Sequence, residues 1–142
     1  MSFIKQSMVG VLLSSLCALP VYAAQKETIH FKNQRGSTMT LVWDEKGDNN
    51  TGTLTGTFTT AVGSCKPDVG VPQALTGYFN GNVLAMTVNF PHCKKVAAMT
   101  ANISDDKTKM HAMWLVGNHA NDPTGKDWDS NIVGMDTYHR IK

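Results

Sequence analysis

Hydrophobic and polar residues alternate along most of the chain after residue 28, which is the pattern of β-strands with one buried face. The stretch 51–62 shows this clearly, because Gly56, Phe58 and Thr60 share one face while threonines occupy the other. No stretch after residue 23 has the period of a helix. We therefore predict eight strands, over residues 29–33, 38–43, 51–62, 73–79, 82–90, 96–104, 109–117 and 132–140.

Turn residues separate these strands. Asn80-Gly81 is a strong hairpin signal, and Gly36 and the run 105–107 mark two further turns. Short connections make sequential strands pair as antiparallel neighbours, and eight such strands can close around one small ligand. We predict an all-β fold, an eight-stranded antiparallel up-and-down β-barrel.

The later strands are apolar on both faces, which exceeds what a single barrel needs. Ala98, Met113, Leu115, Val133 and Met135 lie on faces opposite to the predicted core. An apolar outer face is typical of a surface that a second subunit covers. We therefore expect at least a homodimer.

The first 23 residues have the composition of a secretory signal peptide. Lys5 precedes an apolar run over 8–19, and Pro20 precedes a small-residue cleavage site that ends at Ala23. The apolar run is shorter than the roughly 20 residues that span a bilayer, which argues against a membrane anchor. We expect cleavage after Ala23, a secreted or periplasmic protein, and a single domain over residues 24–142.

Charge and cysteine content limit the kinds of partner and of covalent or metal link that we expect. The chain has 13 basic and 11 acidic residues with no basic run longer than Lys94-Lys95, so we expect neither nucleic acid nor a membrane as partner. Cys17 leaves with the signal peptide, and a disulfide between Cys65 and Cys93 is the natural interpretation in an exported chain. A metal site is the alternative, and it is weakened because no histidine lies at ligand spacing from these cysteines.

Several segments resemble the avidin and streptavidin family, in the same order and at similar spacing over residues 29–140. They are NQRGSTMTL, LTGTFTTAVG, LTGYF, MTVNF, AMWLV and DWDSNIVGMDTY. The resemblance implies a barrel that holds biotin non-covalently in its open end, with no cofactor. The cysteine pair resembles that of the dimeric bacterial avidins, whereas Trp128, which reaches a neighbouring site in tetrameric relatives, leaves a tetramer open.

The resemblance also implies ligand contacts by position. Asn33 and Ser37 would donate to the ureido oxygen of biotin, and Thr60 and Asp136 would accept from its N–H groups. Such groups can satisfy a buried urea, and the charge-assisted bonds are the stronger ones. The other positions around the ligand are Phe58, Gly63, Ser64, Phe90, Met99, Trp114, Val116 and Trp128.

Five positions depart from the family pattern. Phe58 replaces a tyrosine donor, Phe90 and Met99 stand at tryptophan positions, Ala97 replaces a hydroxyl residue, and Lys95 lies where a small hydroxyl residue meets the ligand tail. Each lost donor costs roughly 1–3 kcal/mol. We therefore expect biotin binding at an affinity below the extreme values of the family.

No enzyme motif is found. The sequence has no GxSxG or HExxH, and its five histidines lack metal-ligand spacing, so we expect no catalytic residues. The alternative function is an exported barrel that binds another small apolar ligand or inhibits a protein. Asn33, Ser37, Thr60 and Asp136 favour biotin, because an apolar carrier has no use for a buried polar set.

Overall fold

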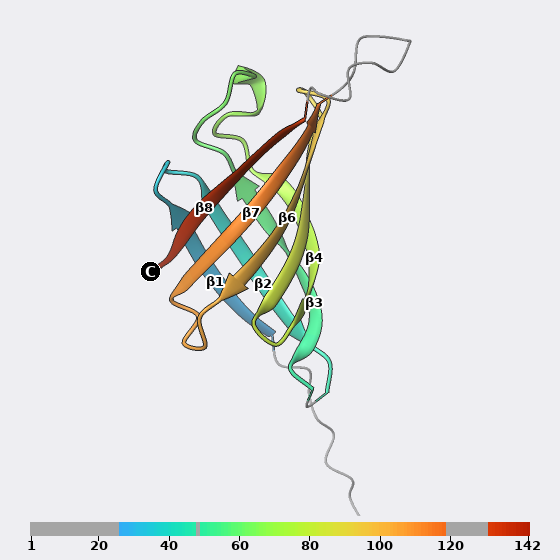
Figure 1. Cartoon of the computed structure of the whole chain (residues 1–142), viewed down its shortest axis with the longest axis vertical. Helices are drawn as coiled ribbons and strands as arrows, with labels where there is room; N and C mark the ends of the chain where they lie inside the picture. Colours follow the sequence, from blue (N-terminus) through green and yellow to red (C-terminus); the bar gives the residue numbers. More distant parts are fainter. Residues whose placement is uncertain (1–25, 48, 119–130) are drawn as a thin grey trace, which may run out of the picture.

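A computed structural model describes residues 26–47, 49–118 and 131–142. Each strand pairs with the next in antiparallel order, and β1 pairs with β8, so that the sheet closes into a barrel (Figure 1). This confirms the predicted fold class. The strands are β1 (Lys26–Asn33), β2 (Thr38–Glu45), β3 (Thr51–Thr59), β4 (Gln73–Asn80), β5 (Val83–Phe90), β6 (Lys95–Ile103), β7 (Lys109–Asn118) and β8 (Ile132–Ile141).

The predicted signal peptide and Trp128 lie outside the described residues. No helix in the described part of the chain is long and apolar enough to cross a membrane.

Alternate residues of each strand point into the barrel and form one core. Burial of each large apolar side chain contributes about 1.5–3 kcal/mol. Trp43 and Phe79 pack with ring centroids 5.4 Å apart near the end where β2 turns into β3. The connections after β1, β3 and β5 gather at the other end, which we call the mouth (Figure 1).

Two strand boundaries differ from the prediction by three residues, and the others agree within two. β3 ends at Thr59 rather than at residue 62, because the Thr60 hydroxyl donates to the Val62 carbonyl at 2.6 Å and turns the chain. β1 begins at Lys26, three residues early, where Lys26 faces Asp44 of β2 and pairs with it at 3.7 Å.

The expectation of no helix missed one turn. The 3₁₀ turn η1 (Lys66–Asp68) lies in the connection between β3 and β4. Pro67 favours it because the proline ring fixes a helical φ.

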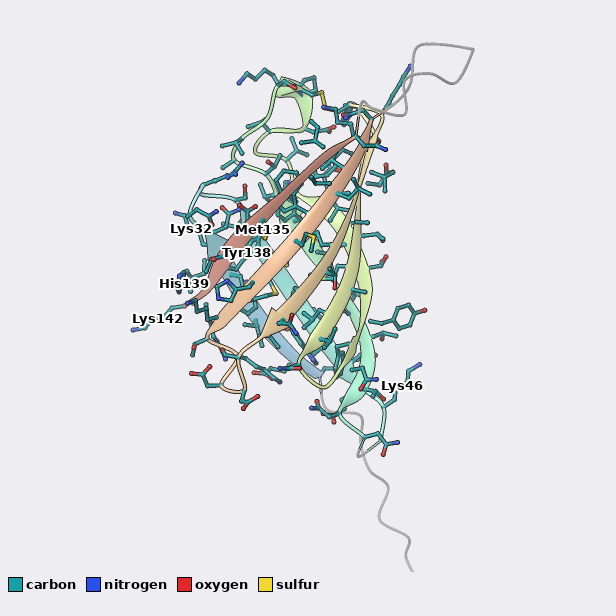
Figure 2. The ribbon with its side chains drawn as sticks, in the orientation of Figure 1. Lys32, Lys46, Met135, Tyr138, His139 and Lys142 are labelled. Carbon is teal, nitrogen blue, oxygen red and sulfur yellow. A yellow bond between two sulfur atoms is a disulfide. The ribbon has the colours of Figure 1, made fainter. Side chains whose placement is uncertain are left out.

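The outer face of the last strands is apolar, as the sequence indicates. Cross-strand neighbours Met113 and Met135 are 55% and 73% exposed, and the neighbouring pair Leu115 and Val133 are 43% and 70% exposed. Ala98 of β6 faces Leu115 and extends the surface. We call these five residues the outer apolar face; Met135 is labelled on β8 in Figure 2.

Candidate functional site

A cavity of about 250 Å³ opens at the mouth of the barrel. It is mainly apolar with a few polar groups, which is typical of small-molecule sites. Its apolar wall includes Phe58, Phe90, Met99, Trp114, Val116 and Ile132. The residues Gly63, Ser64 and Cys65 of the connection after β3 also line it.

The hydroxyl groups of Ser37 and Thr60 line the cavity with opposite hydrogen-bonding roles. The Ser37 Oγ atom accepts from the Ala61 backbone N–H at 3.0 Å, which leaves its proton free to be donated. The Thr60 hydroxyl donates its proton to the Val62 carbonyl, and its oxygen accepts from the Val62 backbone N–H at 3.3 Å, which leaves one lone pair. Ser37 can therefore offer a donor and Thr60 an acceptor to a ligand.

Asp136 is a buried carboxylate in the cavity wall with partners on both oxygens. Its Oδ2 atom accepts from Asn33 Nδ2 at 3.1 Å and from Trp114 Nε1 at 3.0 Å. Its Oδ1 atom accepts from Gln34 Nε2 at 2.8 Å and lies 3.4 Å from Arg35 Nε. Hydrogen bonds thus use three of the four lone-pair sites of the carboxylate, and Arg35 lies near the fourth without a hydrogen bond.

Asn33 lies beside the cavity and not in its lining. Its side-chain oxygen accepts from the backbone N–H groups of Arg35 at 3.0 Å and Ser37 at 2.8 Å. Its side-chain nitrogen donates to Asp136. In this state the Asn33 amide shapes the turn after β1 and orients Asp136.

The aromatic wall is held by two contacts. The rings of Phe58 and Phe90 meet edge to face with centroids 6.2 Å apart. The Trp114 ring covers Gly134 so closely that any Cβ at position 134 would overlap it. This close approach aims the indole N–H at Asp136.

Two loops of the mouth are joined covalently. Cys65 and Cys93 form a disulfide, as the sequence predicts, and it links the connection after β3 to the turn after β5. The cysteine sulfurs and an Asp68 oxygen lie within 4.8 Å of one another, but both sulfurs are consumed by the disulfide.

Asp68 is a buried group that the sequence analysis missed. Its carboxylate accepts from Gln73 Nε2 at 3.2 Å and from the Cys93 backbone N–H at 2.9 Å, and it lies 2.8 Å from His92 Nδ1. It therefore joins the same two loops as the disulfide. An acidic residue in a polar loop carries no pattern that signals burial, so the sequence offered no clue.

Tyr138 is fully buried in the cavity wall, two residues after Asp136 and on the same face of β8. Burial and the negative charge of Asp136 raise the pKa of its phenol above the ordinary value, against smaller opposite effects of Asn33 and Arg35. Because Tyr138 lies two positions after Asp136 on one strand, the alternation of the strand could have predicted that both point into the barrel.

Comparisons with known proteins agree on one family. The pattern described as the Avidin family matches residues 23–141. The crystal structure of core-bradavidin is similar at 25% identity and a TM-score of 0.64, over 81% of this chain and 100% of that one. The bradavidin2–biotin complex is similar at 24% identity and a TM-score of 0.63, over 80% of this chain and 96% of that one.

A biotin binding protein from chicken is similar in structure at 17% identity and a TM-score of 0.64, over 80% of this chain and 94% of that one. The comparison with curated protein sequences gives no match.

Proposed function

The chain belongs to the avidin family, and from this we propose that it binds biotin non-covalently in the mouth of its barrel. Avidin-family proteins are binding proteins, which argues for binding rather than catalysis. Bradavidin2 and rhizavidin, which are similar in fold, have structures as biotin complexes.

The observation that carries the proposal is the fixed polarity of the two hydroxyl groups. A urea offers one carbonyl acceptor and two N–H donors. Ser37 has a proton to donate because its oxygen accepts from the Ala61 N–H. Thr60 keeps one lone pair to accept, because its proton goes to the Val62 carbonyl and its other lone pair faces the Val62 N–H. The aromatic and aliphatic wall suits the apolar part of the same ligand.

Asp136 can contribute a second acceptor through its fourth lone-pair site once Arg35 moves aside. Arg35 is the partner that can move, because its contact is the longest at 3.4 Å and its side chain is 49% exposed. The contact is an ion pair without a hydrogen bond, so a ligand N–H can replace Arg35 at this oxygen at the cost of the ion pair. Together with Phe58 in place of a phenol donor, this cost supports an affinity below the family's extreme values.

We also propose that the protein is exported after cleavage at Ala23 and that it forms at least a dimer through the outer apolar face. A larger assembly would give Trp128 a role at a neighbouring site.

Isothermal titration calorimetry of the purified protein with biotin tests the function. We expect saturable binding with one ligand per chain. The variant Phe58→Tyr returns a hydroxyl to the wall, and if it points at the ureido oxygen it tightens binding by roughly tenfold, the value of one hydrogen bond. Tyr78→Phe, which removes an exposed hydroxyl on the outside of β4, is the control and leaves the affinity unchanged.

The alternative function is a barrel that binds another small apolar ligand or inhibits a protein. The reduced aromatic wall at Phe90, Ala97 and Met99 supports this alternative. Absence of heat with biotin, together with binding of an apolar dye that Met99→Trp abolishes, would favour the apolar carrier.

A further inference from the structure

Lys95 belongs to the lining of the cavity at the mouth. It is the first residue of β6 and shares the inward face with Ala97 and Met99, and it is partly buried. It lines the cavity together with these two residues. The next inward residue is an alanine, so nothing large lies below the lysine on its own strand.

The other charges of the cavity lining have partners. Asp136 has Arg35 and three neutral donors, and Asp68 has His92, Gln73 and a backbone N–H. Lys95 has none: over residues 26–47, 49–118 and 131–142, no carboxylate lies within 4.0 Å of its ammonium group. The Lys95 ammonium group is therefore available to bind a carboxylate that a ligand brings.

The surrounding loops strengthen the positive charge. The described segments 34–37, 60–72 and 91–95 at the mouth carry four basic residues against one acidic residue, Asp68. The basic residues are Arg35, Lys66, Lys94 and Lys95. The cavity lining itself holds two basic and two acidic residues, so Lys95 is the charge of the lining that a ligand anion can pair with.

We propose that Lys95 recognises a free carboxylate on the ligand, so that the protein selects the free acid over its neutral amides and esters. The inference rests on the proposed function, because biotin carries such a carboxylate at the end of its tail. An ammonium–carboxylate contact at a partly buried site is a charge-assisted hydrogen bond, which a neutral carboxamide cannot replace. Lys95 is thus a specificity-determining residue.

The test is calorimetry at low salt with two probes, biotin and biotinamide, which differ only in the charged group of the tail. We expect the unmodified protein to prefer biotin by about ten- to a hundredfold. Lys95→Gln should weaken biotin by a similar factor and bring the two ligands close together. Lys95→Arg retains the charge and should retain the preference.

Lys66→Gln is the matched control, because Lys66 is exposed near the mouth but does not line the cavity. It should keep the preference for biotin, and thermal melts should show that all variants are folded. Equal affinity for both probes in the unmodified protein would overturn this inference alone, as would a Lys95→Gln variant that weakens both ligands equally. Binding of neither probe would overturn the biotin proposal and this inference with it.

Discussion

Asp136 joins side chains that lie about a hundred residues away in the sequence. Its contacts to Asn33 and Gln34 cross the seam between β8 and β1, and Trp114 reaches it from β7. In the described part of the chain, every fully buried side-chain nitrogen and oxygen atom has a hydrogen-bond partner. The loss of this acceptor therefore leaves the buried Asn33 amide and the partly buried Trp114 N–H unpaired, each at a cost of about 1–3 kcal/mol, whereas the exposed Gln34 can turn to water.

Replacement of this carboxylate tests whether it serves the ligand, the fold or both. We expect Asp136→Ala to weaken biotin binding by one to several decades, because a buried N–H donor of the ligand loses a charged acceptor worth roughly 2–5 kcal/mol. The variant should still fold, with a lower melting temperature. Asp105→Ala, on an exposed turn, is the control. A large fall in melting temperature with unchanged affinity would show that Asp136 is purely structural.

Because the phenol of Tyr138 is buried, we expect the protein to lose stability at alkaline pH. Its pKa in the folded protein is raised above the ordinary value of 10.0, so the folded state holds the phenol proton more tightly than the unfolded state. The resulting stability is fully present below about pH 10 and is lost as the pH rises through the folded pKa.

Urea unfolding at pH 8 to 11 measures this effect. We expect Tyr138→Phe to cost about 1 kcal/mol near neutral pH, because the phenol loses its hydrogen bond with the Asn33 side chain, and to flatten the alkaline decline in stability. Parallel declines in the two proteins would show that other groups cause it.

The sequence predicted the position of a single residue correctly where the alternation of a strand decides which face the residue occupies. It failed where the position depends on side-chain torsions. Alternation places Ser37, Phe58 and Asp136 on the inner face, and the structure brings all three to one cavity. The inward turn of Asp68 and the contact of Arg35 with Asp136 depend on loop conformation and side-chain torsions. No periodic pattern encodes these.

At the scale of elements, all eight strands were predictable because each has one apolar face and is bounded by turn residues. The errors fall at strand ends, where a side chain can hydrogen-bond the backbone in place of the neighbouring strand. Thr60 does this after β3. Chain reversals of two to five residues left little freedom for alternative pairing. The longer connection after β3, with its 3₁₀ turn and disulfide, could not be derived in this way.

The disulfide should stabilise this connection and with it the fold. It closes a loop of sequence separation 28, for which the chain-entropy account gives about 3–4 kcal/mol. The double variant Cys65→Ser with Cys93→Ser should lose this much free energy of unfolding in urea titrations.

Intact-mass measurement with an alkylating reagent, with and without reductant, checks the bond itself. Two thiols that react freely in native protein without reductant would contradict it. Asp68 holds the same loops by hydrogen bonds, so we expect the double variant to remain folded.

At the scale of the whole molecule, closure of the barrel satisfies the edges of the sheet but leaves the outer apolar face uncovered. Contiguous exposed apolar side chains of this kind usually mark an interface. The sequence signalled the face through strands that are apolar on both sides. It does not encode the number of subunits, because one face is compatible with several symmetric assemblies.

Light scattering at micromolar concentration should show at least a dimer. Met135→Glu puts an unpaired charge at the outer apolar face and should shift the protein towards a monomer. Tyr78→Glu introduces the same charge on β4, where Tyr78 is 71% exposed, and should leave the assembly unchanged. A monomer without any substitution would contradict the proposed interface.

The direction of the first and last strands has a practical consequence. β1 runs towards the mouth and β8 runs away from it, so Lys26 and Ile141 both lie towards the floor of the barrel (Figure 1). A fusion partner or solid support attached at Lys142 would therefore leave the mouth facing solution. Chemical coupling through amines would be less selective, because the mouth loops also carry Lys66, Lys94 and Lys95, and a molecule attached there is held by the end that its ligand must enter.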